Sequence, residues 1–424
     1  MKRISLSLLF LISVAFVQAQ NPMHPTVTKF NTYYSSNQAD SIFLLFNAKM
    51  KDAVKPEGAT MLVNQLKSGL GTIVKTRKVE SPAPGVNEYR ISFEKPIVDL
   101  ALIIQEDSIA GIWQRPVENT SSDSTVQASP DNFSVDNDYG TLYGTLVLPE
   151  VEGKVPVVLM IAGSGPTDRN MNQGAALKTN SALQLAEALA KNGIASLRYD
   201  KRGVGKSADA IGTSDVVLGD FIEDAELFVA KLQADARFSN VIVLGHSEGS
   251  IIGSVASLES KPTAFISLCG PANPLLDLVR TQIKGSISPE NLLIANEVLD
   301  SLKAGKTFSR NLPPALAPLF HPSVQPYLIS TNQYRPTTIV SVLEIPILIV
   351  GGDNDLQVRI QETNLLAKAA KKATVHRIHS MNHILKSAPT DRAGNLATYN
   401  RPDLPLHPDL APILIDFIKK VSKI

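Results

Sequence analysis

The stretch that most constrains this chain is residues 240–250, Asn-Val-Ile-Val-Leu-Gly-His-Ser-Glu-Gly-Ser. The four apolar residues 241–244 predict a strand buried on both faces, as in a parallel sheet. The motif Gly245-His-Ser-Glu-Gly249 follows at once, and the small and apolar residues 250–256 can begin a helix. A Gly-x-Ser-x-Gly motif between strand and helix predicts a sharp turn, because its glycines let the helix pass close to the strand. We therefore expect Ser247 to stand exposed at the carboxyl edge of a sheet.

This position suits a serine that attacks a carbonyl group. The backbone N–H of Glu248 lies at the positive end of the predicted helix, where it can face an oxygen that becomes negative during reaction. Short Gly-x-Ser-x-Gly strings also arise by chance, so the motif needs partners elsewhere in the chain.

Length and composition predict an ordinary globular protein with more than one domain. The chain has 424 residues, which is long for a single core. The net charge is +1 and no long basic run occurs, so the sequence gives no reason to expect a nucleic-acid partner.

The first residues have the pattern of an export signal. Met1-Lys-Arg3 is followed by an apolar segment over residues 4–17 and by small residues near Ala19. This predicts a signal peptide over residues 1–19 and an exported protein, periplasmic or secreted. No later stretch is long and apolar enough to suggest a membrane span. The single cysteine, Cys269, excludes an internal disulfide and is expected to be a small buried residue.

Residues 25–115 predict a small α+β domain. Residues 28–34 and 40–46 carry apolar side chains at helical spacing, and Pro56 can open a further helix. The period then changes to two at Tyr89, Ile91 and Phe93, which is typical of strands. Helices followed by an antiparallel sheet resemble the NTF2-like modules found ahead of secreted hydrolases. This domain shows no catalytic constellation, so it is expected to pack or dock. Residues 116–131, rich in Ser, Thr, Asp and Pro, predict a linker.

Residues 132–424 alternate strands with helices, which predicts a doubly wound, mostly parallel sheet. Buried strands are expected over residues 155–161, 194–198, 263–269, 345–350 and 374–378, in addition to the strand before Ser247. The alternation stops between about residues 272 and 340, where the chain is helical and broken by prolines. This insertion is expected to cover the carboxyl edge of the sheet as a lid and to bound an acyl pocket.

Two further polar residue types follow strands of this sheet. Asp353 and Asp355 lie in Gly351-Gly-Asp-Asn-Asp355, and His383 follows the last strand. The order serine, acid, histidine resembles the α/β-hydrolases over about residues 133–424. The resemblance implies a Ser247-His383-Asp355 triad, because the family's acid usually stands three residues after a glycine that ends the strand. Asp353 is expected to brace its loop instead.

The resemblance also implies an oxyanion hole. Its donors would be backbone N–H groups of Glu248 and of the loop after residue 161, with Ser164 and Gly165 as the expected residues. Ala162 stands where lipase-type members have a histidine, which leaves the substrate subclass open. Asp200-x-Arg-Gly-x-Gly-x-Ser207 is a further hallmark that we interpret as structural.

Other polar residues have simpler explanations. Asp168 and Arg169 are expected to pair with each other, and His246 to pack within the turn. His376, His379 and His383 could suggest zinc, but no carboxylate cluster accompanies them, so neither a metal nor a cofactor is predicted.

The sequence thus predicts a serine hydrolase that cleaves short or medium acyl esters of a small-molecule substrate. Thioester hydrolysis and aminopeptidase-type amide hydrolysis use the same residues and stay open. A hydrolase fold without activity, serving as a binding scaffold, is the alternative from another class. The sequence does not indicate an oligomeric state.

Overall fold

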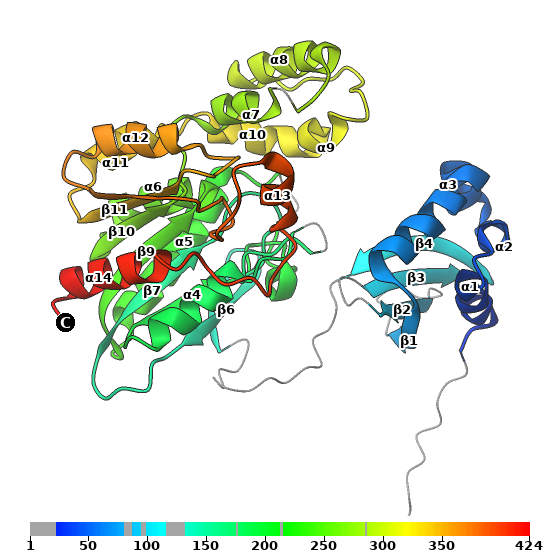
Figure 1. Cartoon of the computed structure of the whole chain (residues 1–424), viewed down its shortest axis with the longest axis horizontal. Helices are drawn as coiled ribbons and strands as arrows, with labels where there is room; N and C mark the ends of the chain where they lie inside the picture. The colour runs from blue at the N-terminus through cyan, green and yellow to red at the C-terminus, as the bar shows by residue number, and fades with distance from the viewer. Residues whose placement is uncertain are drawn as a thin grey trace, which may run out of the picture. The chain divides into compact units, whose positions relative to one another are not determined.

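A computed structural model describes residues 23–79, 87–94, 99–115, 132–174, 177–212, 215–284 and 286–424. These residues form two compact units, one before and one after segment 116–131 (Figure 1). The predicted signal peptide, residues 1–19, and the predicted linker, residues 116–131, lie outside the described residues.

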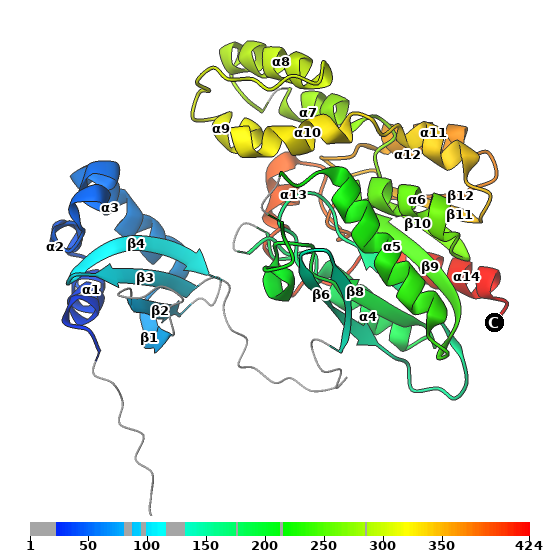
Figure 2. The same cartoon turned by 180° about the vertical axis from the view of Figure 1, so that it is seen from behind.

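The N-terminal unit packs three helices against one face of a four-stranded antiparallel sheet (Figures 1 and 2). The sheet order is β1-β2-β3-β4. The elements are α1 (Pro25–Ser35), α2 (Ala39–Leu44), α3 (Ala48–Leu70), β1 (Ile73–Val79), β2 (Asn87–Phe93), β3 (Asp99–Gln105) and β4 (Ser108–Arg115). Its core contains Phe30 and Tyr34 of α1 with Ile91 and Leu102 of the sheet, all at most 1% exposed.

The order of helices and strands in this unit agrees with the prediction, with two refinements. The helix expected to open at Pro56 is the second part of α3, because Lys55 has a non-helical backbone (φ 55°, ψ 163°) and marks a kink. Strand β1 was not predicted. It is an edge strand, and its Lys and Arg side chains leave only a weak apolar alternation. The NTF2-like resemblance itself stays a prediction.

The second unit is built on an eight-stranded sheet of order β12-β11-β10-β9-β7-β8-β6-β5. The β5–β6 and β6–β8 pairs are antiparallel, and the other five neighbouring pairs are parallel. The strands are β5 (Phe133–Asn137), β6 (Gly140–Val147), β7 (Val155–Ile161), β8 (Ala195–Tyr199), β9 (Phe238–His246), β10 (Ala264–Leu268), β11 (Ile347–Gly352) and β12 (Thr374–Ile378). Strands β7, β8, β10 and β11 are buried along their whole length, which explains their unbroken apolar sequences.

Helices cover both faces of this sheet (Figures 1 and 2). On one face lie α4 (Ser181–Ala190) and α14 (Leu410–Ser422), whose apolar side chains share a core with β9 and β11. On the other lie α5 (Leu218–Ala234), α6 (Glu248–Ser260), α11 (Pro336–Val342) and α12 (Ile360–Ala369). A short helix, α13 (Arg392–Ala397), precedes α14. The alternating pattern predicted this doubly wound sheet, and the three layers form the α/β-hydrolase fold that the resemblance implied.

Between β10 and β11 the chain makes the predicted helical insertion. It contains α7 (Leu275–Ile283), α8 (Pro289–Lys303), α9 (Ala317–Phe320) and α10 (Gln325–Thr331), which gather outside the two helical layers (Figure 1). The insertion has its own apolar cluster, including Leu276, Leu299 and Phe320, each fully buried. Among the described residues, no helix combines the length and apolarity needed to cross a membrane.

Candidate active site

Ser247 occupies the sharp turn that the sequence predicts. It lies between β9 and α6 with a strained backbone of φ 55° and ψ −125°. The flanking glycines are required sterically, because a Cβ on Gly245 would lie 2.1 Å from the carbonyl oxygen of Gly249. A Cβ on Gly249 would lie 2.3 Å from the carbonyl oxygen of Ile161 on β7. Packing of α6 onto the sheet therefore holds the serine in its turn.

The three predicted triad residues meet at the carboxyl edge of the sheet. They follow strands β9, β11 and β12, which run parallel and end at the same edge. His383 Nε2 lies 3.0 Å from Ser247 Oγ, and His383 Nδ1 lies 2.7 Å from Asp355 Oδ2. The side chains of His383 and Asp355 are 6% and 0% exposed. This burial excludes water from the His383–Asp355 hydrogen bond and strengthens it.

The two neighbouring aspartates have different surroundings. Asp355 Oδ1 accepts hydrogen bonds from the backbone N–H groups of Gln357 and Val358, both at 2.8 Å, which leaves Oδ2 facing His383. Asp353 Oδ1 accepts from the backbone N–H of Ser380, and its Oδ2 lies 2.8 Å from His379 Nδ1. Asp353 thus ties its loop to the residues after β12, as expected, and only Asp355 contacts the triad histidine.

The loop after β7 passes directly over the serine. A Cβ on Gly163 would lie 3.1 Å from Ser247 Cβ, so the backbone here approaches the nucleophile as closely as glycine allows. Glu248 is the first residue of α6, and the first N–H groups of a helix have no intrahelical acceptor. Both predicted sources of oxyanion donors, the loop with Ser164 and Gly165 and the N-terminus of α6 at Glu248, therefore lie beside Ser247.

Asp200 has the structural role that was predicted for its motif. One ion pair expected from the sequence, between Asp168 and Arg169, is wrong. Arg169 pairs with Asp200 at 2.6 Å rather than with Asp168. Asp168 instead accepts backbone N–H groups of its own loop, from Asn170 and Asn172. The sequence suggested the wrong pair because adjacent residues in a turn point away from each other. Gly205, at φ 54°, lets the chain close around the Asp200 carboxylate.

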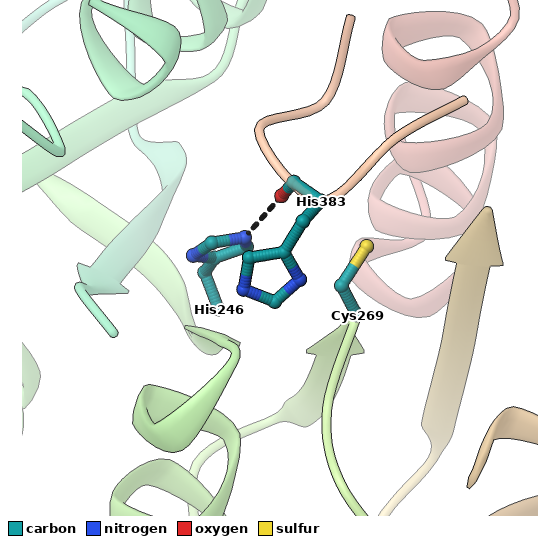
Figure 3. Close-up of side chains that lie close together, drawn as sticks. All are labelled: His246, Cys269 and His383. Atoms are coloured by element: carbon teal, nitrogen blue, oxygen red, sulfur yellow. Dashed lines mark hydrogen bonds between the residues drawn. The ribbon is translucent and has the colours of Figure 1, made fainter. Parts of the chain in front are cut away.

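His246 has a closer relation to the triad than packing alone. Its Nε2 lies 2.8 Å from the backbone carbonyl of His383, and the two ring centroids are 4.9 Å apart (Figure 3). Burial, together with the nearby His383, lowers the pKa of His246 to about 3. The ring is therefore neutral near pH 7, and Nε2 carries the proton that it donates to this carbonyl.

His246, His383 and Cys269 are the only group among the described residues whose ligand atoms lie close enough to suggest a metal, within 4.8 Å of one another. Both nitrogens of His383 already face Ser247 and Asp355, and Nε2 of His246 is used as well. Figure 3 draws the His383 ring between His246 and the thiol. Burial raises the pKa of Cys269 well above its ordinary value, which disfavours the thiolate that metals bind. These residues fit a triad and its packing better than a metal site.

A cavity of about 50 Å³ opens beside Ser247. Its walls come from the β7–α4 segment and from the residues around His383: Gly163, Ser164, Thr167, Met171, Gln173, Leu177, Thr179, Ser181, His246, Gln357, Ile384 and Leu385. None of the described residues of the helical insertion lines this cavity, so the cavity does not support the expectation that the insertion bounds the acyl pocket. The segment that lines the cavity is irregular and therefore has no helical or strand period by which it could be recognised.

A mostly parallel sheet carrying Ser, Asp and His after β9, β11 and β12, with the serine in a strained turn, has the α/β-hydrolase fold. Residues 172–311 match the family described as "Serine aminopeptidase, S33". The chain is 24% identical over 367 residues to esterase EstD of Thermotoga maritima, covering 84% of this chain and 87% of that protein. It is a hydrolase with an esterase among its relatives.

Similar solved structures include Est1E from Butyrivibrio proteoclasticus, at 19% identity and TM-score 0.45, covering 69% of this chain and 100% of that one. The Pyrococcus furiosus esterase PF2001 has 15% identity and TM-score 0.46, covering 72% of this chain and 97% of that one.

Proposed function

We propose that this protein is a carboxylesterase that uses Ser247 as nucleophile, His383 as general base and acid, and Asp355 as the carboxylate that orients the histidine. The observation that carries the proposal is the unbroken Asp355–His383–Ser247 hydrogen-bonded chain beside an open cavity. The likeness to esterase EstD supports ester hydrolysis over the other acyl transfers.

The reaction follows from this arrangement. Ser247 Oγ attacks the ester carbonyl carbon while His383 Nε2 takes the hydroxyl proton. The carbonyl oxygen becomes an anion and is stabilised by backbone N–H groups of Glu248 and of the loop with Ser164 and Gly165. The tetrahedral intermediate breaks the C–O bond to the leaving alcohol, which receives the proton from His383. A water molecule then attacks the acyl-Ser247 ester, with His383 again accepting the proton and returning it to Ser247.

The cavity supports short acyl chains within the predicted range of short to medium. Its volume is about 50 Å³, and besides Ser247 and His383 seven of its lining residues have polar side chains: Ser164, Thr167, Gln173, Thr179, Ser181, His246 and Gln357. A long alkyl chain would exceed this space and would lie partly against polar walls, which do not favour apolar groups. We therefore expect acetyl to butyryl esters to be the best substrates.

An ester, a thioester and an aminoacyl amide with matched acyl groups test the proposal. We expect the ester to have the highest kcat/KM, and rapid labelling of Ser247 by a fluorophosphonate. A preference for the amide would favour the aminopeptidase alternative, which the family match to residues 172–311 keeps open. Absence of both labelling and turnover would favour an inactive scaffold.

For the N-terminal part we propose export through the signal peptide at residues 1–19 and a packing or docking role for residues 25–115. The match to EstD covers 84% of the chain, more than residues 132–424 supply, so it includes part of the chain before the hydrolase unit. Determining the N-terminus of the mature protein tests export. An N-terminus still at Met1 would contradict cleavage after residue 19, and retention of the protein in the cytoplasm would contradict export.

A further inference from the structure

Lys201, in the motif after β8, is a buried cation that contacts both predicted sources of oxyanion donors. It is 2% exposed. Its Nζ donates to the carbonyl oxygens of Gly163 at 3.0 Å and Gly165 at 3.5 Å. The same Nζ lies 3.6 Å from Glu248 Oε1, and Phe221 lies beneath it at 4.4 Å.

The hydrogen bond from Lys201 to the carbonyl of Gly163 fixes the orientation of the peptide bond between Gly163 and Ser164. The bond is planar and trans, so its C=O and N–H point in opposite directions. With the oxygen of Gly163 held by Lys201 in the interior, the N–H of Ser164 is directed to the opposite side. Gly163 and Ser164 line the same cavity as Ser247, so that side is the reaction site. Hydrogen bonding of the carbonyl to a cation also polarises the peptide and makes its N–H a stronger donor.

Glu248 connects Lys201 to the second expected oxyanion donor, which is the backbone N–H of Glu248 itself. Its backbone begins α6, whereas its side chain is 1% exposed and paired with Lys201. Among the described residues, no hydrogen bond within 3.5 Å reaches either carboxylate oxygen of Glu248 or the Tyr327 hydroxyl, although Tyr327 is close enough to interact with this carboxylate. Burial and the Glu248 charge raise the pKa of that tyrosine well above its ordinary value. A buried carboxylate whose nearest compensation is one lysine is costly for stability, which points to a role beyond packing.

We propose that Lys201 is a positioning residue of the oxyanion hole, which aims the Ser164 N–H at the reacting oxygen and ties this peptide to Glu248. The proposal rests on the proposed ester hydrolysis. The carbonyl oxygen of Ser164 accepts hydrogen bonds from Thr167 and Gln173 on the cavity side, so the N–H of Gly165 points away from the cavity. The proposal therefore selects Ser164 over Gly165 as the loop donor.

The neighbouring residue provides a matched control. Arg202 is 5% exposed and pairs at 2.8 Å with Asp224, which is fully buried. Arg202 makes no hydrogen bond or ion pair with the described residues of the loop after β7 and instead binds α5. Removing either buried pair therefore costs stability of a similar kind, but only the Lys201 pair touches the oxyanion loop. The comparison uses K201M/E248Q against R202M/D224N, since each double variant avoids leaving a lone buried charge.

Hydrolysis of p-nitrophenyl acetate is measured with the full chain. The rate is divided by the concentration of folded protein, which near-ultraviolet circular dichroism gives. For K201M/E248Q we expect kcat to fall about 100-fold, the effect of losing one oxyanion donor, with KM within about threefold. A short alkyl trifluoromethyl ketone, which forms a charged adduct with the serine, should lose affinity by the same factor. R202M/D224N should lose thermal stability but keep kcat within about threefold. E248Q alone keeps both carbonyl contacts of Lys201 and should lose less than tenfold.

The outcomes separate the two proposals. Unchanged ketone affinity in K201M/E248Q, or an equal loss of kcat in R202M/D224N, would show that Lys201 only supports the fold. A loss in E248Q alone as large as in the double variant would assign the effect to Glu248 rather than to Lys201. A wild-type protein that neither hydrolyses the ester nor binds the ketone would instead overturn the esterase proposal.

Discussion

Replacing Asp355 by asparagine tests the triad with almost no change in shape. The backbone N–H groups of Gln357 and Val358 both donate to Asp355 Oδ1, so an asparagine keeps its oxygen there. Its NH₂ group must then occupy the place of Oδ2, 2.7 Å from His383 Nδ1. An NH₂ group can only donate, so Nδ1 becomes the acceptor and the ring proton moves to Nε2, which faces Ser247. In this tautomer the ring cannot accept the serine proton.

We expect Asp355→Asn to lower kcat for an acetyl ester by about 10⁴-fold, which corresponds to about 5.4 kcal/mol of barrier. Both backbone hydrogen bonds are kept, so the melting temperature should change little. Asp353→Asn is the control: it weakens contacts to His379 and Ser380, costs about 1 kcal/mol of stability and leaves kcat within about threefold. Initial rates are compared under identical conditions. The reasoning is refuted if Asp355→Asn keeps a tenth of the activity, or if Asp353→Asn is the inactive variant.

Three further outcomes are expected. Ser247→Ala should abolish turnover and fluorophosphonate labelling with an unchanged circular dichroism spectrum; retained turnover would exclude the serine mechanism. Met171→Ala enlarges the cavity and should raise the hexanoyl-to-acetyl ratio of kcat/KM roughly tenfold. Leu276→Ala in the insertion should lower the stability by about 2–5 kcal/mol and leave that ratio unchanged. The reverse pattern would show that the insertion forms the pocket wall. The pKa of His246 is lowered to about 3, so between pH 6.5 and 3 the unfolded chain binds the extra proton and stability falls as pH falls. His246→Gln should remove up to about 1.4 kcal/mol per pH unit of that loss in denaturant titrations at pH 7 and pH 4.5; an equal loss in this variant and the wild type would refute this.

The sequence predicted those parts of the molecule whose structure is determined by a short stretch of neighbouring residues. The turn at Ser247 was predictable because only glycine fits at 245 and 249, and the sheet because buried parallel strands are apolar throughout. The choice of Asp355 relied on resemblance to known hydrolases. Lys201 gave no signal, because its contacts with Gly163 and Glu248 join segments far apart in the chain.

The cavity walls were missed for a related reason. The segment that includes Thr167, Met171 and Thr179 has no helical or strand period, and it is fixed by hydrogen bonds within its own loop. The insertion was recognised from its prolines and leucines, but composition alone could not show that it packs mainly on itself. The pairing of Arg169 with Asp200 likewise depends on β8 bringing a distant residue beside the loop.

The order in which the triad residues follow their strands also sets when a growing polypeptide acquires reactivity. Ser247 precedes His383 by 136 residues, and Asp355 precedes it by 28. A ribosome adding roughly 5–20 residues per second needs on the order of 10 s to cover the longer interval. During that time the nascent chain has its serine but no base to activate it. A product that ends before β12, through stalled translation or proteolysis, is therefore unreactive toward acyl esters, and hydrolysis is confined to molecules whose synthesis has passed the last strand.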